Sequence, residues 1–167
     1  KVKHQLSANS EISLIGLGAI DNFELNEGVN DNITDEETLK RNRYALSNIT
    51  IQEQWNYTVG AVYKYFGENS MKEIILSSNV WNNNAKKYFN NTNNLNDLLL
   101  DYSSKEIENK LRFENTSTLK NNYKLNVGVG LENATYTNST FQRLALSDGV
   151  QEIDFSSKLS MLKYNLF

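Results

Sequence analysis

The sequence contains no cysteine and no proline, and its only histidine is His4. Without cysteine there is neither a disulfide framework nor a thiolate metal site. A single histidine has no second histidine with which to form a zinc site or a histidine-based triad. The absence of proline suits a chain of hydrogen-bonded strands, because proline removes a donor from the ladder. We therefore expect a β-rich protein that is not an enzyme and holds no metal or cofactor.

The sequence also lacks a long apolar run and a strong charge of one sign. The longest apolar segment, ISLIGLGAI at 12–20, is far shorter than the roughly 20 residues of a membrane helix. The net charge is −3, which argues against a nucleic-acid partner. A mean hydropathy of −0.57 would suggest a soluble protein. However, the strands of a transmembrane β-barrel alternate apolar and polar residues, so their average is polar as well.

Alternation with a period of two residues, typical of strands, runs through most of the chain. It predicts one all-β unit over residues 1–167, with strands at about 1–7, 11–25, 53–66, 71–84, 99–119, 123–144 and 150–167. Short polar turns at 7–10, 67–70 and 120–122 alternate with long loops at 26–52, 85–98 and 145–149. We therefore expect an antiparallel sheet with short turns at one end and long loops at the other. A short helix with Thr34 as its N-cap is expected in the first long loop.

The segment QWNYTVGAVYKYF at 54–66 places aromatic residues at both ends of one face and small aliphatic residues between them. Ten residue steps span roughly 33 Å, or roughly 23 Å when tilted by about 45°. This is close to the apolar band of about 25 Å, flanked by aromatic girdles, in outer-membrane barrels. The residues predicted to face lipid are Trp55, Tyr57, Val59, Ala61, Tyr63, Tyr65, Leu125, Val127, Val129 and Leu131.

Charges of alternating sign follow the other face of the segment 106–119. They predict a wall toward a polar lumen, formed by Glu108, Lys110, Arg112, Glu114, Lys124, Asn126 and Glu132. The solvated face of a soluble antiparallel sheet is the alternative. Against it, several predicted strands exceed ten residues, whereas strands in soluble proteins most often have about 5–6. The acids Asp31, Asp35, Glu36 and Glu37 lack the spacing of a calcium loop and are interpreted as a solvated helix start.

The segments IGLGAIDNFELN (15–26), EQWNYTVGAVYKYF (53–66), LLLDYSSKEIENKLRFENTS (98–117) and GVGLENATYTNSTF (128–141) resemble the barrel wall of TonB-dependent receptors from Bacteroidetes-type bacteria. The resemblance implies a barrel of about 22 strands around a plug domain in the cell outer membrane. It also implies import of a nutrient such as an iron chelate, cobalamin or an oligosaccharide. The implied partners are outer-membrane lipid, the plug and remaining barrel strands, the TonB complex and a surface lipoprotein.

Two alternatives stay open. The ending MLKYNLF, with Tyr164 and Phe167, resembles the C-terminal signal of complete outer-membrane proteins and would suit a small structural or adhesive barrel. Because bacterial barrels have an even number of strands and seven are predicted, we expect a partial barrel instead. The second alternative is a soluble β-sandwich or lipocalin-like binding protein.

Overall fold

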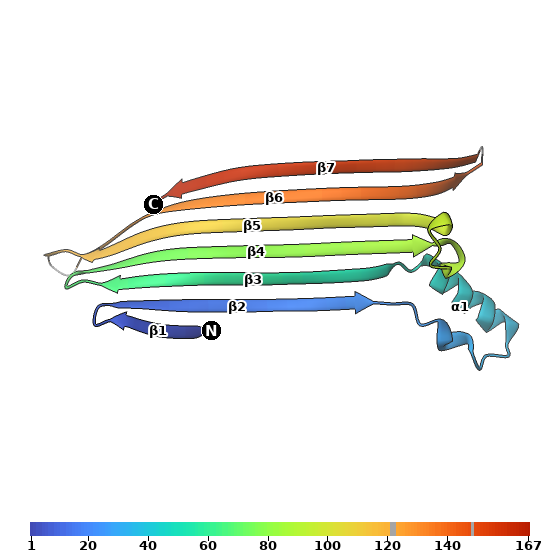
Figure 1. The fold of residues 1–167 in the computed structure, drawn as a ribbon, viewed down its shortest axis with the longest axis horizontal. Helices are drawn as coiled ribbons and strands as arrows, with labels where there is room; N and C mark the ends of the chain where they lie inside the picture. Colours follow the sequence, from blue (N-terminus) through green and yellow to red (C-terminus); the bar gives the residue numbers. More distant parts are fainter. Residues whose placement is uncertain (121–122, 148) are drawn as a thin grey trace.

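The computed structural model describes residues 1–120, 123–147 and 149–167. They form one antiparallel sheet of seven strands in sequence order, and the sheet is not closed, so that β1 and β7 are its edges (Figure 1). The strands are β1 (Val2–Ser7), β2 (Ser10–Phe23), β3 (Ile51–Phe66), β4 (Ser70–Tyr88), β5 (Leu98–Thr118), β6 (Lys124–Leu146) and β7 (Gly149–Leu166). The all-β antiparallel prediction is thereby confirmed.

The short turns lie together at one end of the sheet, and the turns after β1 and β3 each accept a backbone hydrogen bond from the last residue of a neighbouring strand (Figure 1). The backbone N–H of Phe66 donates to the carbonyl of Asn9 at 2.8 Å, and that of Thr118 donates to Asn69 at 2.7 Å. The pairing therefore continues into the turns. Within the turn predicted at 120–122, residues 121 and 122 lie outside the described residues.

The opposite end carries the longer connections, including the helix α1 (Glu36–Asn48) and the short 3₁₀ turns η1 (Glu27–Asn30), η2 (Phe89–Asn91) and η3 (Leu95–Asp97) (Figure 1). Side chains of the sheet hold these loops: the Lys87 ammonium donates to the carbonyl of Ile49 at 3.1 Å. The Arg143 guanidinium donates to the carbonyl of Asn96 at 2.9 Å. The short helix is confirmed, but its N-cap is Asp35 and not Thr34.

Two predicted loops need correction. The strand β4 continues to Tyr88, so that residues 85–88 belong to the sheet and not to the second loop. Cross-strand contacts stabilise this extension, as between Lys86 and Asp101 at 3.6 Å. The connection predicted at 145–149 is also short, because β6 ends at Leu146 and β7 begins at Gly149. Residue 148 within it lies outside the described residues.

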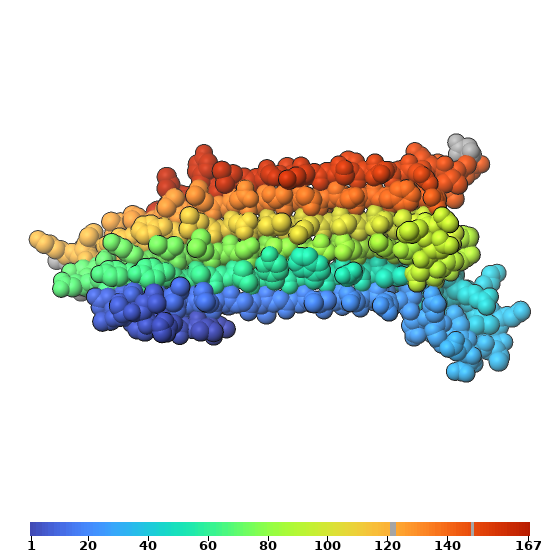
Figure 2. Space-filling model, viewed as in Figure 1, coloured from blue at the N-terminus to red at the C-terminus, as the bar shows by residue number. Residues whose placement is uncertain are grey.

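The sheet has almost no core of its own. Among the described residues the only buried apolar side chain is Val80, which is 3% exposed. Neighbouring strands pack side by side (Figure 2), but β1 covers only the part of β2 up to Leu14, and β7 pairs with β6 only from Val129 onward. No helix in the described part of the chain is long and apolar enough to span a membrane. Neither face of the sheet is covered by a second layer of the described residues.

Candidate functional site

Strand alternation and the pairing register divide the sheet into two chemically different faces. We name them the apolar face, which bears Val59, Leu111 and Val129, and the polar face, which bears Lys64 and Lys110. Every residue predicted to face lipid lies on the apolar face, and every residue predicted to face a lumen lies on the polar face. The register thus places each of these two groups on one side of the sheet, and their assignment to lipid and to a lumen stays a prediction.

A row of apolar side chains crosses all seven strands of the apolar face in register. It consists of Val2, Leu14, Ala61, Leu76, Leu111, Leu131 and Tyr164. The next row toward the short turns is also apolar apart from His4, and consists of Ile12, Tyr63, Ile74, Phe113, Val129 and Leu166. We call these two rows the apolar band. Such a stripe across a sheet needs a partner surface, because exposed apolar patches of this extent are unusual in soluble monomers.

Toward the long loops the apolar face becomes polar, and the position along the strand at which this change occurs differs between strands. On β3 it stays apolar from Tyr65 to Trp55, as predicted. On β5 and β6 it changes earlier, where Asn109 pairs with Asn133 directly beyond the Leu111 row. The strands thus extend well past the apolar band toward the long loops.

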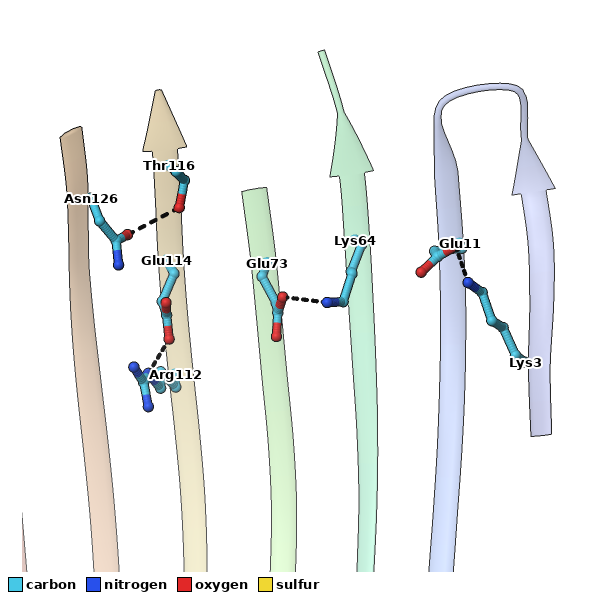
Figure 3. Close-up of polar contacts among 8 residues, drawn as sticks. All are labelled: Lys3, Glu11, Lys64, Glu73, Arg112, Glu114, Thr116 and Asn126. Atoms are coloured by element: carbon cyan, nitrogen blue, oxygen red, sulfur yellow. Dashed lines mark hydrogen bonds and ion pairs between the residues drawn. The ribbon is translucent and has the colours of Figure 1, made fainter. Parts of the chain in front are cut away.

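The polar face carries a belt of ion pairs at the level of the apolar band (Figure 3). The carboxylate of Glu73 lies 2.8 Å from the Lys64 ammonium. The Lys110 ammonium lies 3.0 Å from Glu108 and 3.7 Å from Glu132. Further pairs join Lys3 to Glu11 at 2.7 Å, and Arg112 to Glu114. We call these residues the ionic belt.

The carboxylates of the ionic belt are more shielded than apolar residues of the apolar band, whereas the belt cations Lys110 and Arg112 stay 45% and 49% exposed. Leu76 and Leu131 are 52% and 44% exposed, whereas the side chains of Glu73 and Glu132 are 18% and 23% exposed. A water-soluble sheet normally shows the reverse, with one apolar face packed on a core. The shielding is thus confined to the carboxylates, which lie against the long side chains of their cationic partners.

Gly128 and Gly130 lie on the polar face and allow other groups to pass close to β6. A Cβ atom at Gly128 would meet the ring of Phe167 and, at 2.8 Å, the backbone carbonyl of Phe113. The Arg112 guanidinium lies over the Phe167 ring, 5.0 Å from its centroid. Tyr164 belongs to the apolar row, so Tyr164 and Phe167 project to opposite faces.

The two tryptophans lie on opposite faces, which the sequence reasoning did not state. Trp55 is on the apolar face, stacked on Tyr57 with ring centroids 6.2 Å apart and with the Lys105 ammonium 5.6 Å from its ring. Trp81 pairs with Asn56 on the polar face. The sequence could have predicted this placement, because Trp81 directly follows Val80 in the same strand and successive residues of a strand project to opposite faces.

Two carboxylates of the polar face pair in register, since Glu73 on β4 lies opposite Glu114 on β5. Each of them contacts a cation, Lys64 and Arg112 respectively, so both belong to the ionic belt. Glu132 pairs with Lys110 and not with a second carboxylate of β5. Over residues 1–120, 123–147 and 149–167, no group of three or more His, Asp or Glu side chains could hold a metal ion.

We compared the chain with models of known protein families and with curated protein sequences. No family model matches it, and no curated protein matches it.

Proposed function

We propose that this chain forms part of the wall of a transmembrane β-barrel in a bacterial outer membrane. The observation that carries the proposal is the apolar band, which crosses all seven strands in register and is left uncovered by the described residues. Acyl chains would cover the apolar face, while the ionic belt would face a polar interior. Antiparallel pairing satisfies the backbone groups between strands, as hydrocarbon surroundings require.

The position of the apolar band along the strands supports the same assignment. It lies next to the short turns, and the strands continue beyond it to the longer β2–β3 and β4–β5 connections and α1, while the β6–β7 connection at that end is short. Outer-membrane barrels have short periplasmic turns and longer extracellular loops. In the proposed orientation, the turns therefore face the periplasm and α1 lies outside the cell.

We further propose that the barrel is that of a TonB-dependent receptor, a non-enzymatic protein that imports a nutrient such as an iron chelate, cobalamin or an oligosaccharide. The quoted resemblance of the strand segments supports this part. The open edges β1 and β7 would pair with further strands, and a plug domain would fill the interior. The TonB complex would supply energy, and a surface lipoprotein would cover the outer opening.

A pair of cysteine substitutions tests the membrane assignment directly, because the natural chain has no cysteine. Leu131→Cys and Glu132→Cys are adjacent in β6 but lie on opposite faces. In intact membranes, a water-soluble maleimide should label Glu132→Cys and should label Leu131→Cys only after detergent is added. Equal labelling of both variants without detergent would contradict the proposal.

A further inference from the structure

On the polar face, the chemistry changes between the ionic belt and the long loops. Three successive rows there hold Thr58, Asn79 and Glu108, then Asn56, Trp81, Glu106 and Tyr136, then Gln54, Asn83, Ser104 and Asn138. We call these residues the aromatic–amide wall. The three rows contain no Lys, Arg or His on any strand, and their charges are carboxylates. Glu108 belongs to both regions, because it lies 3.0 Å from Lys110 of the ionic belt. Beyond Glu108, amides and aromatic rings replace the paired charges.

Trp81 is the largest ring of this wall and is 53% exposed. Its neighbours on β3 and β5 are polar, whereas toward the edges of the sheet the same rows become apolar, with Leu17 and Ala19 on β2 and Leu159 and Met161 on β7. Asn56 and Glu106 flank it in register on the neighbouring strands, and Tyr136 follows Glu106 on β6. Among the described residues, no aromatic ring or cation stacks on Trp81, in contrast to Trp55. A large exposed ring with hydrogen-bonding neighbours is a common element of ligand sites.

The amides around Trp81 are oriented by contacts with one another and keep unused donors. The Thr58 hydroxyl donates to Asn79 Oδ1 at 2.8 Å, and Gln54 Nε2 donates to Asn83 Oδ1 at 3.1 Å. Each of these bonds uses the oxygen of the asparagine and leaves its Nδ2, with two N–H donors, directed elsewhere. The carboxylate of Glu106 adds acceptors beside them. Donors and acceptors therefore lie on both sides of the exposed ring.

We propose that the aromatic–amide wall binds a neutral oligosaccharide. The C–H face of a pyranose ring can stack on the indole of Trp81, while its hydroxyl groups, which both donate and accept, bond to the amides and to Glu106. Anionic ligands such as ferric chelates are disfavoured, because the three rows contain no cation of their own, Lys110 in the adjacent row is already paired with Glu108, and the Glu106 carboxylate beside Trp81 would repel them. This inference rests on the proposed function, since it assigns a ligand class to the polar face that would line the barrel.

Binding to a printed array of neutral and anionic glycans tests the inference, with the full chain solubilised in detergent. At least one neutral oligosaccharide should bind, and neither anionic glycans nor ferric citrate should compete. For a bound neutral glycan, Trp81→Ala should weaken the affinity by roughly ten- to thirtyfold, the size expected for an aromatic anchor. Trp81→Phe retains a ring and should recover most of this loss. Trp55→Phe, on the opposite face, is the matched control and should leave the affinity unchanged.

Assembly of each variant is checked by its electrophoretic mobility before and after boiling, since Trp81 is exposed and its replacement should not prevent folding. Binding of no neutral glycan, preference for ferric citrate, or equal affinity of wild type and Trp81→Ala would overturn the inference. Failure of the proposed function is recognised separately, by equal maleimide labelling of Leu131→Cys and Glu132→Cys. If Glu132→Cys is labelled, Leu131→Cys is protected and no neutral glycan binds, the membrane assignment stands and only the proposed ligand class is refuted.

Discussion

The ammonium of Lys64 lies 2.8 Å from the carboxylate of Glu73 across β3 and β4, while their neighbours Tyr63 and Ile74 pair on the other side of the same two strands. One residue step thus separates a salt bridge from an apolar cross-strand pair. The same two-sided chemistry recurs on β5 and β6, where Lys110 precedes Leu111 and Glu132 follows Leu131. It is the basis of the predictions below.

The apolar band should not tolerate charge if it faces lipid. Leu111→Arg is expected to destabilise the folded protein in lipid vesicles by about 2–4 kcal/mol, the cost of arginine near the bilayer centre. Lys110→Arg, one residue away on the polar face, should change stability by no more than about 0.5 kcal/mol. Urea titration of the protein in vesicles measures both. Equal stability of Leu111→Arg and wild type would show that the band is wetted by water.

The two glycines of β6 should respond differently to the same substitution. Gly128→Ala would bring a Cβ atom to 2.8 Å from the Phe113 carbonyl, which is backbone and cannot turn away. We expect a loss of about 1–3 kcal/mol for this overpacked variant. At Gly130 the new methyl group meets the flexible side chain of Asn165, which can rotate, so a change of only about 0.5 kcal/mol is expected. Comparable losses for both variants in the urea titration would contradict this account.

The Lys64–Glu73 pair should contribute modestly, because both side chains keep some contact with solvent. A double-mutant cycle with Lys64→Met and Glu73→Gln should give a coupling free energy of about 0.2–1 kcal/mol. The coupling should decrease as salt is raised, since exposed charges are screened. A coupling that does not change with salt would indicate a pair sealed from water.

The start of α1 should depend on pH through Asp35. Hydrogen bonds from Thr38, including one from its backbone N–H at 2.8 Å, lower the pKa of the Asp35 carboxyl below its usual 3.8. Because the pKa is lowered on folding, the stabilisation of the helix start by the Asp35 carboxylate is fully present above a pH of about 3.8. It is lost as the pH falls through the lower pKa of the folded state. Hydrogen exchange of the Thr38 amide should therefore show less protection at acidic pH. Asp35→Asn keeps a capping oxygen without a titrating group, so its protection should not show this pH dependence.

The strands and their two faces could be predicted, because the period-two alternation of apolar and polar residues indicates both that a segment is a strand and which of its residues share a face. Val127 and Val129 share a face with Leu131 whatever the partner strand is. The end of β4 could not be predicted in this way, since the segment NNNAKKY has the composition of a loop and is strand only through its pairing with β3 and β5. The register was likewise missing from the sequence, so the proximity of Glu132 to Lys110 and the contact of Arg112 with Phe167 were not foreseen. The N-cap differed by one residue because Thr34 and Asp35 are both good capping residues.

The quenching of tryptophan fluorescence by brominated lipids tests the central claim most directly. The chain has two tryptophans, so Trp81→Phe leaves only Trp55 on the apolar face, and Trp55→Phe leaves only Trp81 on the polar face. In vesicles of brominated phosphatidylcholine, Trp55 should be strongly quenched relative to unbrominated lipid, whereas Trp81 should be unaffected by bromine and quenched by aqueous iodide. Quenching of Trp81 by the lipid, or exposure of both tryptophans to iodide, would contradict the assignment of the apolar face to the membrane.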